Sequence, residues 1–221
     1  METFEKRLKR FTFGNPREPF LNLVNTIANF VRPELKKTVE NGQVYLFFLG
    51  SHAIIQNIAK NIFDKTGIGG TSCYLKNFVD GLSFDTKFSE ISKNIHYMRN
   101  IVAHHILSHS MHNIILDEEL ECGWKQNNND IRVNWHVYAR HFLDAFNRGG
   151  KIYDWDQLLS PNELIVRQYQ FICRYLELPK SHDICKVTIA LKANINDKVV
   201  LHRQVKLIKK LICKNYNITG P

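Results

Sequence analysis

The chain has 221 residues, of which 44% are hydrophobic and 23% charged. This composition is typical of a globular protein that buries a core and argues against a disordered chain. The formal net charge is +9, which favours anionic partners of any class through long-range attraction. Nine basic and two acidic residues lie between Lys180 and Pro221, so most of the net charge belongs to the C-terminal segment.

The cysteines and the apolar segments exclude several classes of protein. The five cysteines include no C-x-x-C pair and are odd in number, so we expect reduced thiols and neither a disulfide framework nor a zinc knuckle. Met1 to Arg10 is charged and contains no apolar stretch of a signal peptide. The longest apolar run, Val44 to Ile55, is interrupted by Gly50-Ser51-His52 and is too short to span a bilayer. We therefore expect a cytoplasmic protein without a membrane partner.

The first half of the chain predicts helices. Phe20, Val24, Ile27 and Val31 recur at helical spacing, which predicts a helix over 16–31 that Pro33 closes. A longer apolar helix is expected over 40–63. The glycine-rich stretch Gly67-Ile68-Gly69-Gly70-Thr71-Ser72 lacks the G-K-[ST] ending of a phosphate-binding loop, so we interpret it as a connector.

Further helices are expected over 73–79 and from a cap at Ser89 to about His112. The acidic, asparagine-rich segment from Asp117 to Asp130 predicts an exposed loop and the best candidate for a domain boundary. We therefore divide the chain into a helical bundle over 1–123 and a helical extension with a basic tail over 124–221. The extension is either a separate region or a continuation of the same domain.

The C-terminal region predicts helices over 135–146 and 162–176. The tail fits two interpretations. Val187, Ile189 and Leu191 alternate as in a strand, so a small hairpin within 185–207 is one of them. Leu201, Val205, Ile208 and Ile212 keep helical spacing for longer, and this favours a pair of helices. The predicted fold class is all-α.

The helix that begins near Ser89 carries the most distinctive residues of the chain. At about 100° per residue, Ile91, Ile95, Met98, Val102 and Ile106 fall on one apolar face. Asn100 and His104 fall together on nearly the opposite side, with Lys93 and Tyr97 beside them, and Arg99 lies at the border. This polar edge is therefore predicted to face solvent or another molecule.

Three further histidines, His105, His109 and His112, share the apolar side of the same helix. Zinc can use histidines at this spacing, but no carboxylate or cysteine is placed to complete a ligand set, although Asp117 or Glu118 lies near enough in sequence to fold back. We expect packed histidines in a bundle interior, no metal and no other cofactor.

The polar edge contains the groups needed for phosphodiester cleavage without a metal. A histidine exchanges protons near neutral pH, and an arginine neutralises the charge that develops on a phosphate. Attack by a ribose 2′-OH on the adjacent phosphate needs no external nucleophile, and DNA lacks that hydroxyl, so the chemistry indicates RNA. The alternative is an ordinary solvated helix face.

The segment from Tyr97 to His105 resembles the R-x4-6-H signature of the HEPN superfamily of helical bundles, here Arg99-Asn100-Ile101-Val102-Ala103-His104. The resemblance implies a metal-independent endoribonuclease whose motif helices meet across a homodimer. It also implies that Arg99 engages the scissile phosphate, Asn100 positions it and His104 moves the proton. His105 is the alternative histidine, because the family tolerates the longer spacing. Ile106 departs from the tyrosine found in one subgroup of HEPN toxins.

The resemblance covers about residues 15–120 and implies toxin or antiphage-defence roles, with an antitoxin or another regulatory protein as partner. Some HEPN domains lack catalysis and act only in nucleic-acid binding or protein interaction, so this function stays open as the alternative. Four basic residues of the tail share one predicted helix face and are candidate RNA-binding residues, together with Lys93 and Tyr97: Arg203, Lys206, Lys210 and Lys214. A solvated helix face is the other interpretation of this charge.

Overall fold

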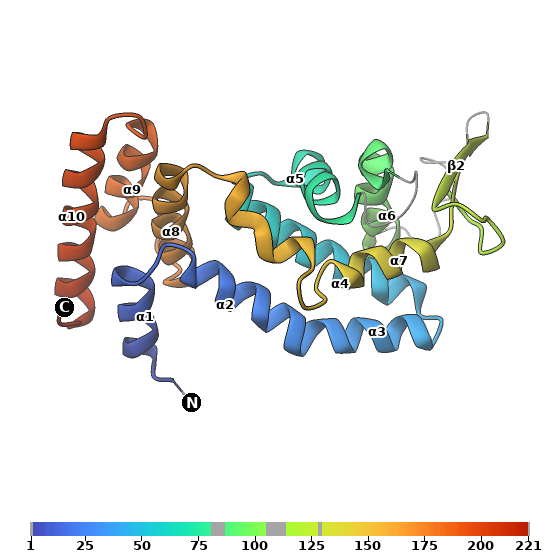
Figure 1. Ribbon diagram of the computed structural model, residues 1–221, viewed down its shortest axis with the longest axis horizontal. Helices are drawn as coiled ribbons and strands as arrows, with labels where there is room; N and C mark the ends of the chain where they lie inside the picture. The colour runs from blue at the N-terminus through green and yellow to red at the C-terminus, as the bar shows by residue number, and fades with distance from the viewer. Residues whose placement is uncertain (1, 81–86, 105–113, 128–129, 221) are drawn as a thin grey trace. The chain divides into compact units, whose positions relative to one another are not determined.

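The computed structural model describes residues 2–80, 87–104, 114–127 and 130–220; for residues 100–104 it describes the backbone. Within this part, the chain forms ten α-helices, several joined by π- or 3-10-helical turns, and one three-stranded sheet (Figure 1). The predicted all-α class is confirmed.

The chain divides into two compact units. One unit contains residues 1–23 and 155–221, and the other contains residues 24–154. This division differs from the boundary at residue 123 expected from the sequence. Residues 124–154 belong with the preceding segment because Ile131 to Val133 pair with a strand at 114–116. They also belong there because Arg32 donates to the carbonyl oxygen of Leu143, at 3.0 Å.

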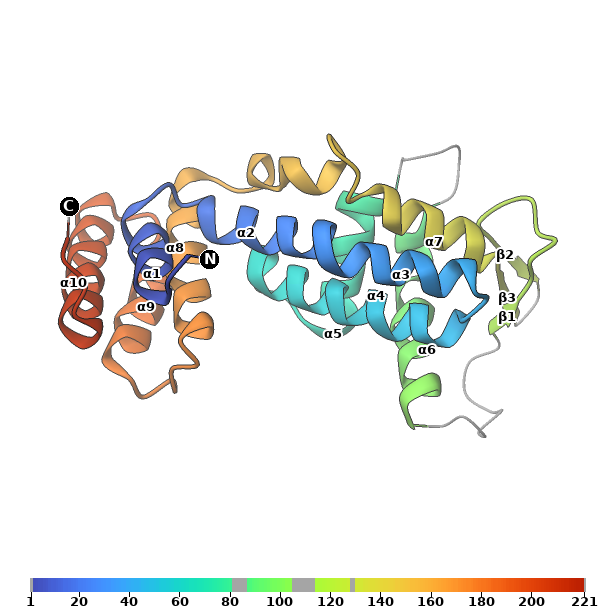
Figure 2. The ribbon, with the colours of Figure 1, turned by 90° about the horizontal axis from the view of Figure 1, so that it is seen from below.

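The unit of residues 1–23 and 155–221 is built from helices with one buried face each. In it, α9 packs against α8 and α10, and α1 packs against the same two helices (Figure 2). Ser160 and Glu163 form a capping box that fixes the start of α8. The four helices are α1 (Phe4–Phe13), α8 (Pro161–Tyr175), α9 (Asp183–Ala193) and α10 (Lys198–Tyr216).

The basic tail is the predicted pair of helices, so the hairpin interpretation is wrong. Ile184, Thr188 and Leu191 are buried at helical spacing on α9, whereas Ile189 is exposed. The strand-like alternation was therefore a coincidence of sequence. Asp197 accepts hydrogen bonds from the backbone amides of Val199 and Val200 and caps α10, which satisfies amide groups that a new helix leaves without partners.

The first predicted helix continues past its expected end. After α2 (Glu18–Thr26), a π-helical turn at Ile27–Val31 leads directly into α3 (Arg32–Glu40). Pro33 does not close the helix, because it occupies the first turn of α3, where the amide hydrogen that proline lacks is not required. The turn that ends α3 contains Gly42, whose φ of 65° favours glycine.

The glycine-rich segment is helical, contrary to the expected connector. The helix α4 (Val44–Ile58) extends through a π-helical turn at Ala59–Phe63, and α5 (Gly67–Tyr74) continues through another at Leu75–Val79. The side chain of Gln56 on α4 accepts from the backbone amide of Gly67 and donates to its carbonyl oxygen. These tertiary contacts fix the start of α5 despite the low helix propensity of glycine.

The predicted loop from Asp117 to Asp130 contains a strand. The strands β1 (Ile114–Leu116), β2 (Trp124–Asn127) and β3 (Asp130–Val133) form a sheet of order β1-β3-β2. The pairing is parallel between β1 and β3 and antiparallel between β2 and β3. Asn134 then caps α7 (Trp135–Asp144) and donates to the carbonyl oxygens of Glu118 and Leu120, which ties the sheet region to the helix.

An aromatic core joins α4, α5 and α7. The ring of Phe48 stacks on Tyr138 with centroids 5.5 Å apart, and Phe47 meets Phe142 edge-on at 5.9 Å. All four rings are buried. The helix α6 (Ser92–His104), which follows a 3-10 turn at Phe88–Ile91, packs against α4 and α5. This packing positions the residues of the signature segment.

Candidate active site

The helix α6 and the 3-10 turn before it bury the predicted apolar face over residues 91–98. Ile91, Ile95 and Met98 are only 2%, 3% and 7% exposed, whereas Lys93 is exposed to solvent. The helical phase assigned from the sequence is therefore confirmed over residues 91–98. The side chain of Val102 and the whole of Ile106 lie outside the described residues.

Of the three predicted catalytic residues, the side chain of one is described. Arg99 is half-buried on α6 and makes no ion pair with a described carboxylate. Asn100 and His104 belong to the same helix, but their side chains are not among those described. His105, His109 and His112 lie outside the described residues altogether. The roles of all these residues remain predictions.

A pair of histidines beside Arg99 was not expected from the sequence. His52 on α4 is 5% exposed, and neither of its ring nitrogens has a hydrogen-bond partner among the described residues. His96, on α6 three residues before Arg99, is half-buried. The centroids of the two imidazoles lie 4.9 Å apart, with the ring planes at 58°. The polar side of α6 is therefore partly covered by α4 and does not face outward along its whole length.

Both imidazoles are held in the neutral form near neutral pH. Burial, followed by the charges of His96 and Arg99, lowers the pKa of His52 to about 4. Burial and the charge of Arg99 also lower the pKa of His96 from its ordinary value. A positive neighbour and a low local polarity both disfavour the imidazolium form. The cluster thus combines one fixed guanidinium charge with two neutral rings.

The hydrogen bonds of Thr71 on α5 determine the tautomer of His96. The Thr71 hydroxyl oxygen lies 3.1 Å from the Gly67 carbonyl oxygen, 3.0 Å from Gln56 Nε2 and 3.1 Å from His96 Nδ1. The carbonyl only accepts, so the single hydroxyl proton is donated to it, as is usual for a helical threonine. We therefore assign a proton to His96 Nδ1, which donates to Thr71, and this leaves the lone pair on Nε2.

The sequence held only a weak signal for this cluster. His52 interrupts an apolar run, and in the sequence this interruption indicates only that the run does not span a membrane. His96 belongs to the same helix as Arg99, one turn earlier, and no pattern links either histidine to the other across the intervening 43 residues. Only the packing of α4, α5 and α6 brings His52, Thr71 and His96 together.

The predicted RNA-binding residues are distributed over the two units. Lys93 and Tyr97 lie on α6 with Arg99, and the Tyr97 ring meets the His96 ring at 5.7 Å. The other four are exposed on α10, belong to the other unit and make no ion pair with a described residue: Arg203, Lys206, Lys210 and Lys214. They recur at helical spacing, so the expected basic face of α10 is present, and its binding role stays a prediction.

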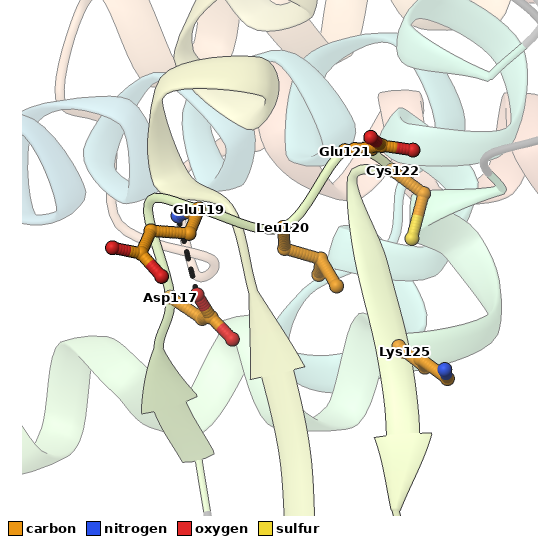
Figure 3. Close-up of a pocket in the computed structure, with 6 residues that line it drawn as sticks. All are labelled: Asp117, Glu119, Leu120, Glu121, Cys122 and Lys125. Carbon is orange, nitrogen blue, oxygen red and sulfur yellow. Dashed lines mark hydrogen bonds between the residues drawn. The ribbon is translucent and has the colours of Figure 1, made fainter.

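An acidic pocket lies at one end of the sheet, with a volume of about 540 Å³. Figure 3 shows Asp117 and Glu119 beside each other after β1, and Lys125 on β2. Asp117 pairs with Arg132 at 3.1 Å, and Glu118 next to it accepts from Trp135 Nε1 at 2.7 Å. These carboxylates stabilise the sheet region. Among the described residues, no group of three side chains could hold a metal ion.

The chain was compared with protein-family models, curated proteins and solved structures, and none of these comparisons found a match. No described helix is long and apolar enough to cross a membrane. The candidate site is therefore defined by the geometry of α4, α5 and α6 and by the signature segment in α6.

Proposed function

We propose that the protein is a metal-independent endoribonuclease of the HEPN type that cleaves RNA by attack of a ribose 2′-OH on the adjacent phosphate. One observation carries this proposal: Arg99 has no carboxylate partner among the described residues and lies near two imidazoles whose pKa values burial, and then its positive charge, hold below the ordinary value. A cation without a described carboxylate partner suits a reaction in which a phosphate gains charge in the transition state.

In this mechanism, Arg99 holds the scissile phosphate and neutralises the charge of the pentacovalent transition state. Asn100 orients the phosphate, and His104 exchanges the proton between the 2′-OH and the leaving 5′-oxygen. The bond from the 2′-oxygen to phosphorus forms as the bond to the 5′-oxygen breaks, which leaves a 2′,3′-cyclic phosphate. We further propose that two copies of α6 meet in a homodimer, and that a regulatory protein such as an antitoxin controls the site.

Cleavage of a labelled single-stranded RNA in the presence of EDTA tests the catalytic proposal. We expect a 2′,3′-cyclic phosphate product from the wild-type protein and at least a ~100-fold lower rate for Arg99→Gln and for His104→Gln, the scale typical of a lost acid–base or charge-stabilising group. Lys36→Gln removes one exposed charge on α3 and serves as the matched control, with an unchanged rate.

A second candidate is RNA binding without catalysis, which the exposed basic face of α10 favours. If the wild-type protein binds RNA without cleaving it, and both variants bind equally well, the endoribonuclease proposal is wrong and this candidate replaces it. Sedimentation of the protein tests the homodimer separately. A monomer mass at concentrations that support cleavage would exclude a composite site.

A further inference from the structure

His52 is the least satisfied buried polar side chain near α6. It is 5% exposed, yet neither ring nitrogen has a hydrogen-bond partner among the described residues. A buried imidazole retained for packing alone normally has at least one nitrogen hydrogen-bonded, because an unpaired buried polar group costs about 1–3 kcal/mol. The two unpartnered ring nitrogens therefore indicate that His52 binds a ligand from outside the described residues.

The charges around His52 define the sign of that ligand. Among the described groups, those that act electrostatically on its ring are His96 and Arg99, and the one that acts on His96 is Arg99. The helix α5 contributes the neutral hydroxyl of Thr71. No described carboxylate balances these groups, so a negatively charged ligand would complement the cluster. A metal cation fits poorly, because Arg99 repels it and the described residues offer no third metal ligand.

We propose that His52 and His96, whose rings lie 4.9 Å apart, form with Arg99 a binding pocket for one phosphate group, and that the phosphate brings a proton onto the imidazole pair. This inference rests on the proposed function in that it assigns the phosphate to the RNA substrate. It adds two residues, from α4 and from the start of α6, that the R-x4-6-H signature does not contain.

The proton uptake follows from the geometry and the charges. His96 Nδ1 donates to Thr71, so Nε2 is the nitrogen that can gain a proton and then donate to a phosphate oxygen. Burial and the neighbouring guanidinium oppose this protonation, as the lowered pKa of His96 indicates. A bound dianion reverses the sign of the local potential and raises the pKa of both rings. Anion affinity must therefore increase as the pH falls.

Sulfate is the decisive probe, because its charge stays constant over the pH range in which inorganic phosphate titrates. We expect the full-length protein to bind sulfate more tightly at pH 5.5 than at pH 7.5, by up to about tenfold per pH unit for uptake of one proton. The ring resonances of His52 and His96 should titrate at higher pH when sulfate is present. Their assignment comes from the spectra of His52→Gln and His96→Gln.

The variants separate the pocket from general charge effects. His96→Gln and Arg99→Gln should each weaken sulfate binding at pH 5.5 at least ~10-fold, whereas Lys36→Gln should not. Because His52 is buried and its replacement can impair folding, the titration of the wild-type rings is the measurement that does not depend on a variant. Ring titrations unchanged by sulfate, or pH-independent sulfate affinity, would overturn the proposal.

A 2′-O-methyl RNA oligonucleotide, which cannot be cleaved by this chemistry, identifies the source of the phosphate. It should displace sulfate and shift the same two ring resonances. Sulfate binding that this RNA leaves unchanged would overturn the assignment of the pocket to an RNA phosphate. The experiments distinguish a failure of the pocket proposal from a failure of the catalytic proposal. A protein that binds sulfate and RNA in this pocket but never cleaves RNA contradicts only the catalytic proposal.

Discussion

His96 Nδ1 lies 3.1 Å from the hydroxyl oxygen of Thr71. This hydrogen bond connects α6 to α5. Thr71 is fully buried and itself accepts from Gln56 on α4. One hydroxyl group thus links all three helices around the histidine pair. The tautomer of His96 depends on this hydroxyl.

Replacing Thr71 by valine should release the His96 ring. Valine keeps the shape of threonine but neither accepts from His96 nor from Gln56, so we expect the free energy of unfolding to fall by about 1–2 kcal/mol. Nitrogen-15 chemical shifts should show the Nδ1-protonated tautomer in the wild-type protein and a mixture of tautomers in the variant. The tautomer assignment would be wrong if both proteins gave the same ring shifts.

Thr188→Val is the matched control for this prediction. Thr188 is also buried in a helix and donates to the carbonyl oxygen one turn earlier, at 2.7 Å, but it lies on α9 in the other unit. The control should cost a similar amount of stability and leave the His96 shifts unchanged.

The low pKa of His52 makes stability depend on pH in one direction. The ring has a pKa of about 4 in the folded chain, against an ordinary value of 6.5, so below pH 6.5 the unfolded chain binds a proton that the folded chain does not. The contribution of the neutral His52 ring to the free energy of unfolding is fully present above pH 6.5 and is lost as the pH falls towards 4. In buffers without sulfate or phosphate, the free energy of unfolding should decrease by at most about 3 kcal/mol over this range.

Urea denaturation at pH 7, 5.5 and 4.5 measures this decrease, and His52→Leu should reduce the slope. His202→Leu replaces an exposed histidine of α10 and should keep the wild-type slope. A slope that is equal in all three proteins would contradict the assignment of this pH dependence to His52.

How much of the fold the sequence predicts depends on how far apart in the chain the interacting residues lie. Local signals were sufficient where the buried face repeats every turn, as for Ile91, Ile95 and Met98, and for the helical pair of the tail. They failed at Gly67 to Ser72, because the start of α5 depends on Gln56, which lies eleven residues away in the chain. They failed at Pro33 because a π-helical turn places the proline where its missing amide hydrogen is not needed.

The candidate site shows the same limit. Arg99 and His104 are predicted as a pair from their spacing within one helix, and this prediction needs no tertiary information. The His52–His96 pair depends on the packing of α4 against α6, and a single sequence contains no periodicity that reports such a contact. The sheet was missed for a related reason, since β1 and β3 are separated by a polar segment that reads as a loop.

The cap of α10 provides a test of the tail. Asp197→Ala removes the carboxylate that accepts from the amides of Val199 and Val200, and we expect a loss of about 1 kcal/mol in the free energy of unfolding. Asp183→Ala is the matched control, because Asp183 is exposed and α9 is capped by His182 instead. Equal effects of the two substitutions would show that the cap does not stabilise α10.

The basic face of α10 should contribute to RNA binding through phosphate contacts alone. Each contact between a lysine and single-stranded RNA releases counterions, so Lys206→Gln with Lys210→Gln should weaken binding and lower the slope of log affinity against log salt by up to about 1.4 for two lost contacts. Fluorescence anisotropy with a 2′-O-methyl RNA at several salt concentrations measures both quantities. The paired substitution Lys36→Gln with Lys37→Gln removes the same charge from α3, where each lysine already pairs with a glutamate. If the α10 variant and this control change the salt slope equally, the α10 face acts only through net charge and is not the binding surface.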